Sequence, residues 1–213
     1  MKTERLIDML STNLEPIDRQ AIRTSLAWAV VAGGVAAFCL MLTTVSLRTD
    51  LAAPASLGFV AVKLLFALTV IGSGLAFLGR AVRPGKDART GFQLALLPFI
   101  VVSVAAVAEL ALGLSTGPHP MTTGTHWLLC LYCIPLFAVI PFILLVWTLR
   151  LGAPTNLTRA GAMAGLVAGA IGAAAYAFHC PDDSLPFIAL WYGESIAFCA
   201  GIGAVLGPRV LRW

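Results

Sequence analysis

Charged residues are scarce in this chain of 213 residues. Asp, Glu, Lys and Arg together make up 11% of it, whereas hydrophobic residues make up 59%. An average soluble domain contains about 25% charged residues. Low-complexity segments and repeats of the soluble type are also absent. Together these features exclude an ordinary soluble domain and indicate that most of the chain lies in a membrane.

Six apolar stretches are long enough to cross a bilayer, which takes about 20 mostly apolar residues. They cover roughly 25–47, 56–78, 92–112, 127–149, 160–178 and 187–207. The first stretch is too long, and lies too far behind polar residues, to be a signal peptide. We therefore predict an all-α polytopic membrane protein, with a six-helix bundle over 25–213 and an aqueous segment over 1–24.

Basic residues gather on one side of this predicted bundle. Six spans place both termini on the same side, and that side holds twelve of the fourteen Lys and Arg residues: Lys2, Arg5, Arg19, Arg23, Arg80, Arg83, Lys86, Arg89, Arg150, Arg159, Arg209 and Arg212. The positive-inside rule then places both termini of this multi-pass protein in the cytoplasm. The net charge of +4 reflects this topology, so no direct nucleic-acid partner is predicted.

The fifth stretch carries glycine at every fourth position, at Gly161, Gly165 and Gly169. Helices in lipid associate through small residues that let their backbones approach closely. We interpret the glycines as a packing face inside the bundle, with a homodimer seam as the alternative. Gly201 and Gly203 in the sixth stretch suit the same role.

Three ionisable residues, Lys63, Glu109 and Glu194, lie within the spans, all in their outer halves. Such residues are costly in hydrocarbon and normally face protein or water. We predict that Lys63 forms an ion pair with one of the two carboxylates, although the sequence does not settle which. An ion path through these residues and the cysteines is the alternative, and it would make the protein a small transporter of metal or other ions.

The stretch "FHCPDDS" (178–184) and the start of the fourth span, "THWLLCLYCIP", bring cysteine and histidine to the outer face. His126, Cys130 and Cys133 share one helical stripe, and His179 and Cys180 lie at a similar level. Two outcomes are open: a disulfide between Cys130 and Cys180 in an oxidising periplasm, or a soft divalent metal ion held by the thiolates with four ligands in all. Considered without the cysteines of the fourth span, the residues after Cys180 predict an ordinary turn, because Pro181 and Pro186 flank Asp182, Asp183 and Ser184.

The N-terminal segment has an apolar face suited to a short amphipathic helix. Its apolar residues are Leu6, Ile7, Leu10, Leu14 and Ile17. A helix of this length is marginal by itself in water, so the face must rest on lipid headgroups, the bundle or another protein. Four acidic residues offset its four bases, which favours docking into a protein partner over an interfacial helix.

The "ERLIDMLSTNL-P" start, the six spans, "CLYCIP", "YAFHCPDDSLPFIALWYGE" and the closing "LRW" resemble the NrsF (negative regulator of sigma F) family of membrane anti-sigma factors. The resemblance implies that the N-terminus holds an extracytoplasmic-function sigma factor at the inner membrane. It also implies that two periplasm-facing cysteines, matching Cys130 and Cys180, sense heavy-metal or oxidative stress. Cys133 has no counterpart in the family pattern, which leaves open which thiol of the fourth span reacts.

We accordingly expect a regulator rather than an enzyme. No resident cofactor is expected, and a divalent heavy metal would act only as a transient signal. Besides the transporter, a quinone-linked thiol oxidoreductase is the enzymatic alternative.

Overall fold

The computed structural model describes residues 19–51, 53–81, 89–113, 124–152 and 154–212. All regular structure within these ranges is helical, as predicted. The elements are α2 (Arg19–Thr44), α3 (Pro54–Ala81), α4 (Arg89–Leu112), α5 (Trp127–Arg150), α6 (Leu157–Tyr176), α7 (Leu185–Phe187), η1 (Ile188–Tyr192) and α8 (Gly193–Val210). The predicted N-terminal helix, with the sigma-binding residues Leu6, Ile7, Leu10, Leu14 and Ile17, lies outside the described residues.

Six helices are long and apolar enough to cross a membrane, which confirms the predicted number of spans. They cover Ile22–Thr44, Ser56–Ala81, Gln93–Leu112, Trp127–Arg150, Leu157–Tyr176 and Leu185–Val210, each within three residues of the predicted limits. The last span differs from a uniform α-helix because it contains a π-helical turn at Ile188–Tyr192. Such a turn changes the helical register and is often found at functional sites.

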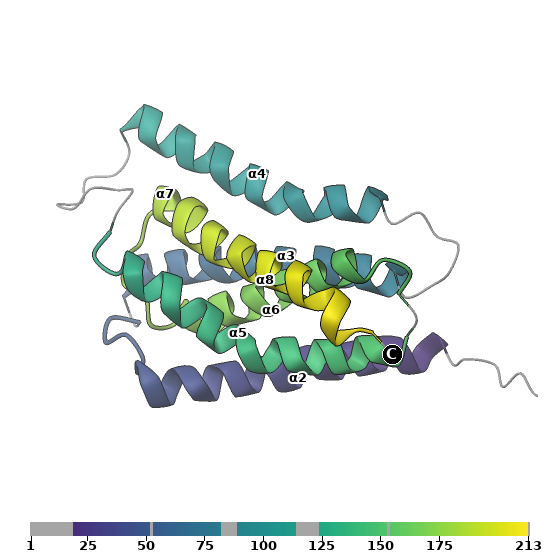
Figure 1. Cartoon of the computed structure of the whole chain (residues 1–213). Helices are drawn as coiled ribbons and strands as arrows, with labels where there is room; N and C mark the ends of the chain where they lie inside the picture. Colours follow the sequence, from purple (N-terminus) through teal and green to yellow (C-terminus); the bar gives the residue numbers. More distant parts are fainter. Residues whose placement is uncertain (1–18, 52, 82–88, 114–123, 153, 213) are drawn as a thin grey trace, which may run out of the picture.

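Helix α6 is the centre of the bundle (Figure 1). Fifteen of its twenty residues are buried, and it packs against α2, α3, α5 and α8. Its sequence consists largely of alanine and glycine, which allows four neighbours to approach one helix closely. Helix α4 lies at the edge of the bundle and contacts α3, α7 and η1.

The glycine face of α6 packs against α8 of the same chain. A Cβ atom on Gly161 would collide with the carbonyl oxygen of Gly203, and one on Gly165 would collide with that of Cys199. The face is therefore a packing surface inside the bundle and is not free to form a seam with a second copy. Gly201 does not share this role, because a Cβ atom there would meet no other atom within 4 Å.

The two ends of the bundle differ in composition. One end carries the last turns of α3, α5 and α8 with Arg80, Arg150 and Arg209. The C-terminus and the start of α2 lie at this same end (Figure 1). The other end carries the connections around residues 45–53, 124–126 and 177–184, where the cysteine and aspartate residues gather. The fold thus separates a basic end from an end that holds the candidate site.

Candidate functional site

Two thiols meet at the non-basic end of the bundle. Cys130 lies in the first turn of α5, and Cys180 follows the end of α6, where its backbone N–H donates to Tyr176 O at 3.1 Å. Both side chains are fully buried and reduced. They form a hydrogen bond with each other. The structure therefore brings together Cys130 and Cys180, fifty positions apart in sequence, the two cysteines to which the family resemblance assigns the sensing role.

The surroundings of Cys180 favour its thiolate. The hydrogen bond from Cys130 lowers the pKa of the Cys180 thiol, and the charge of Lys63 and the backbone N–H of Asp182 act in the same direction against the opposing effect of burial. The thiolate is the form of cysteine that attacks oxidants and binds metals. Of the two thiols, Cys180 is therefore the one whose surroundings favour the thiolate.

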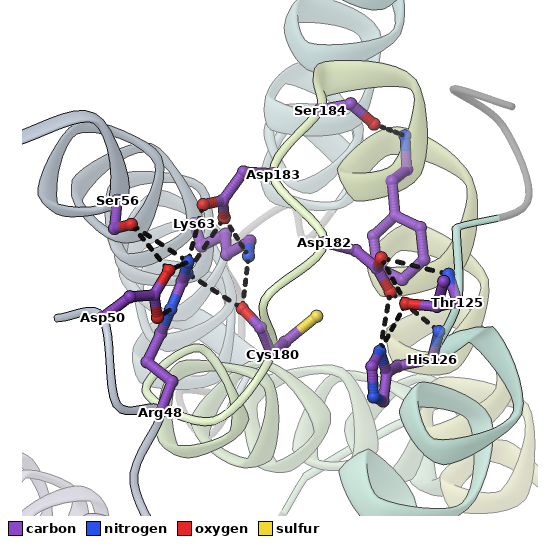
Figure 2. Close-up of polar contacts among 11 residues, drawn as sticks. Arg48, Asp50, Ser56, Lys63, Thr125, His126, Cys180, Asp182, Asp183 and Ser184 are labelled. Carbon is purple, nitrogen blue, oxygen red and sulfur yellow. Dashed lines mark hydrogen bonds and ion pairs between the residues drawn. The ribbon is translucent and has the colours of Figure 1, made fainter. Parts of the chain in front are cut away.

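The backbone carbonyl of Cys180 is held by two cations (Figure 2). Arg48 Nη1 donates to it at 3.1 Å and Lys63 Nζ at 3.0 Å. Asp183 pairs with the same two cations, with Lys63 Nζ at 2.9 Å and Arg48 Nη2 at 2.9 Å. The Arg48 side chain is 3% exposed and that of Lys63 is fully buried, so these charges are compensated inside the protein and not by water. Buried charges require such pairing.

Asp50 and Ser56 complete the surroundings of Arg48. Arg48 Nε donates to Asp50 Oδ1 at 2.7 Å, and Arg48 Nη2 donates to Ser56 Oγ at 3.1 Å. The guanidinium holds the pKa of the Asp50 carboxyl well below its usual range, and Asp50 in turn raises the pKa of Arg48. This pair is thus fully ionised at any physiological pH, and its contribution to stability is lost only in strong acid.

Asp182 points the opposite way from Asp183 and contacts the start of α5 (Figure 2). It accepts hydrogen bonds from Thr125 N at 3.0 Å and His126 N at 2.8 Å, two N–H groups at the start of α5. A carboxylate there also interacts favourably with the helix dipole. The two neighbouring aspartates therefore tie the Cys180 loop to different helices, whereas the sequence predicted only a turn.

The predicted partner of Lys63 was wrong. Lys63 pairs with Asp183, while Glu109 accepts a hydrogen bond from Leu185 N at 3.0 Å and Glu194 is exposed on the surface of α8. The reason is that Asp183 follows Cys180 so closely that its carboxylate reaches the outer part of α3. The sequence predicted only a turn around this aspartate.

The histidines do not join the thiols. His126 Nδ1 contacts Thr125 Oγ1 at 2.7 Å, and His179 Nδ1 contacts Ser46 O at 2.9 Å. Across the described ranges, no group of three or more His, Cys, Asp or Glu residues is arranged to hold a metal ion. The four-ligand site predicted as one alternative is therefore not formed here. Cys133, one turn beyond Cys130, is also buried.

Two tyrosines enclose the thiol pair from the sides of α6 and η1. Tyr176 and Tyr192 are fully buried, with ring centroids 6.1 Å apart, and the Tyr192 ring lies 6.0 Å from Lys63 Nζ. Within the described residues, neither hydroxyl has a hydrogen-bond partner of normal geometry. Tyr176 is the last residue of α6, and Tyr192 ends the π-helical turn.

Residues 10–213 match the family described as NrsF, negative regulator of sigma F. The chain belongs to the NrsF family. Two relatives align over 100% of this chain and 100% of their own length. The probable anti-sigma-F factor NrsF of Azospira oryzae is 32% identical, and the anti-sigma-F factor NrsF of Caulobacter vibrioides is 30% identical. No solved structure matches the chain.

Proposed function

We propose that this NrsF-family protein is an inner-membrane anti-sigma factor. In this proposal its cytoplasmic N-terminus sequesters an extracytoplasmic-function sigma factor, and the outer face of the bundle controls release. The full-length similarity to proteins named anti-sigma-F factors supports the sigma partner. It also favours this function over the transporter and the oxidoreductase predicted as alternatives.

The single observation that carries the control step is the buried Cys130–Cys180 pair. Oxidation of the pair forms a disulfide and releases two protons and two electrons. A peroxide takes them up and is reduced to water or an alcohol. The lowered pKa of Cys180 supplies the attacking thiolate, and Cys130 is the resolving thiol beside it. Burial limits the reaction to small oxidants that can enter when the 181–184 loop opens.

A soft divalent metal ion is the second trigger that the family resemblance implies. The two thiols are suitable ligands for such an ion. Because the described residues supply no third protein ligand beside them, the geometry supports oxidation more strongly. We therefore propose the metal ion only as a second signal, which would bind the same two sulfur atoms.

The sigma partner is tested by removing residues 1–20 from the full chain. We expect the truncated protein to insert into the membrane as before, because the six membrane-length helices begin at Ile22. We expect its co-purification with the sigma factor to fall at least tenfold, since the apolar face over 6–17 is removed. The measurement is co-purification from membranes, with each sigma factor of the host presented in turn.

A matched control replaces Leu6, Leu10 and Leu14 together with serine, which keeps the length of the segment. Equal loss in both variants assigns binding to the apolar face. Undiminished capture by the truncated protein contradicts the proposed role of the N-terminus.

A further inference from the structure

The connection between α2 and α3 is fastened directly to the Cys180 loop. Arg48 donates from its backbone N–H to Phe178 O at 3.1 Å and from its side chain to Cys180 O and to both oxygens of Asp183, at 3.1, 3.1 and 2.9 Å respectively. His179 Nδ1 adds the contact of 2.9 Å to Ser46 O. These bonds join residues two and four positions beyond the end of α2 to the segment that contains Cys180.

Helix α2 is a suitable carrier of movement to the opposite end of the bundle. It has 26 residues, which at about 1.5 Å per residue corresponds to roughly 39 Å. Its far end adjoins the N-terminal segment to which we assign sigma binding. The helix makes extensive contact with α5 and α6 and only slight contact with α3. The bonds of the 45–50 connection add to these contacts at the outer end of the helix.

The connection is held in a conformation that is unfavourable for its sequence. Ser46 has a φ of 61°, in the left-handed region that non-glycine residues seldom occupy. Its carbonyl oxygen is the group that His179 contacts. Contacts to the Cys180 loop therefore compensate for local strain, and losing them would allow the connection to relax.

We propose that the hydrogen bonds and ion pairs joining Arg48 and Lys63 to Cys180 O and Asp183, here called the latch, hold α2 in the sigma-binding position. Reaction of the Cys180 sulfur opens the latch. The inference rests on the proposed function and goes beyond it by naming positioning residues that have no reactive group of their own. It assigns to Arg48 and Asp183 the transfer of the signal from Cys180 to α2.

The chemistry of the pair acts on the latch through movement of Cys180. Formation of a sulfur–sulfur bond moves Cys180 toward Cys130, and the carbonyl held by Arg48 and Lys63 belongs to that same residue. The movement draws this carbonyl away from the two cations, so that the strained connection is released together with the outer end of α2.

The test compares Arg48→Gln with Asp182→Asn in the full-length protein, reconstituted in nanodiscs with reduced cysteines. Arg48→Gln removes the charge that joins α2 to the Cys180 loop. Asp182→Asn changes the same loop on the side that contacts α5. We expect Arg48→Gln to raise the Kd for the sigma factor at least tenfold without oxidant, and Asp182→Asn to change it less than twofold. Binding of the sigma factor by Arg48→Gln within twofold of the unsubstituted protein overturns the latch.

A second comparison tests whether the latch acts downstream of the thiols in the transfer of the signal. Arg48→Gln combined with Cys130→Ser and Cys180→Ser is expected to show the same tenfold weakening. A purely structural defect would weaken sigma binding in both variants in proportion to their fall in unfolding temperature, whereas the latch predicts weakening in Arg48→Gln even where the two temperatures fall equally. If Arg48→Gln does not fold, Asp183→Asn, which is nearly isosteric, must show the tenfold weakening; binding within twofold of the unsubstituted protein again overturns the latch.

The proposed function is judged by the unsubstituted protein in the same assay. If that protein does not bind a sigma factor, or binds one and keeps it after oxidation, the proposed function fails. If it binds and releases the sigma factor while Arg48→Gln and Asp183→Asn behave identically to it, only the latch fails.

Discussion

Replacing Cys130 and Cys180 together with serine is expected to leave the sigma factor bound during oxidative stress. The unsubstituted protein should release most of it under the same conditions. Moving a two-state equilibrium from 99:1 to 1:99 takes about 5.5 kcal/mol. Formation of the disulfide must supply this bias by moving Cys180 away from the groups that hold its carbonyl. The double variant lacks both sulfur atoms, so no disulfide can form and the oxidant has no effect on sigma binding. The measurement is sigma co-purification before and after peroxide treatment.

The matched control is Cys133→Ser on the same helix. Cys133 is buried as Cys130 is, but Cys130 is the residue that forms a hydrogen bond with Cys180. We therefore expect Cys133→Ser to release the sigma factor normally. Normal release by the Cys130→Ser, Cys180→Ser double variant would refute the thiol trigger. Loss of release in Cys133→Ser alone would transfer the role of the α5 thiol to that residue.

Gly165→Leu is expected to cause the largest loss of stability in the chain. A Cβ atom at Gly165 would meet the backbone of α8 at Cys199 and Ala200, which cannot move without separating α6 from α8. Overpacking costs about 1–3 kcal/mol in typical cases, and we expect a value at the upper end. This corresponds to a fall of roughly 6–12 °C in unfolding temperature for a chain of this size.

Gly201→Leu is the matched control for this effect. Gly201 is exposed on α8, and a Cβ atom there meets nothing within 4 Å. We expect its unfolding temperature to stay within about 2 °C of the unsubstituted protein, since leucine is also a better helix former than glycine. Thermal unfolding of both variants in detergent measures the difference. An equal fall in unfolding temperature in both variants would show that α6 and α8 are not tightly packed at Gly165.

Much of the fold could be predicted because the bilayer imposes a simple length requirement. Each apolar stretch had to be about 20 residues long and helical to satisfy its backbone in lipid. The spacing of Gly161 and Gly165 further predicted a close helix contact, although it did not identify α8 as the partner. The π-helical turn at Ile188–Tyr192 was not predictable in the same way, because no local pattern in "IALWY" distinguishes it from an α-helix.

The sequence predicted that Cys130 and Cys180 lie at the same face, but it did not predict the residues that hold the Cys180 loop. Cysteine at two places on the outer face predicted the pair, since both spans begin or end at that level. Arg48 and Asp183 were missed because they lie in separate connections, 135 residues apart, whose relative position depends on the packing of three helices. Arg48 nevertheless stood out in the sequence. It lies in a predicted outer loop, whereas twelve of the fourteen Lys and Arg residues lie on the opposite side.

The central claim is that the thiol site and the basic end of the bundle lie on opposite sides of the membrane, so that a signal received outside must be passed inside. Its most direct test uses two single-cysteine variants without the five native cysteines: Pro181→Cys, beside the thiol site, and Thr155→Cys, between α5 and α6 at the opposite end. Both positions are exposed. The account predicts that a membrane-impermeant maleimide added to spheroplasts labels Pro181→Cys at once and Thr155→Cys only after permeabilisation. The reverse pattern would contradict it.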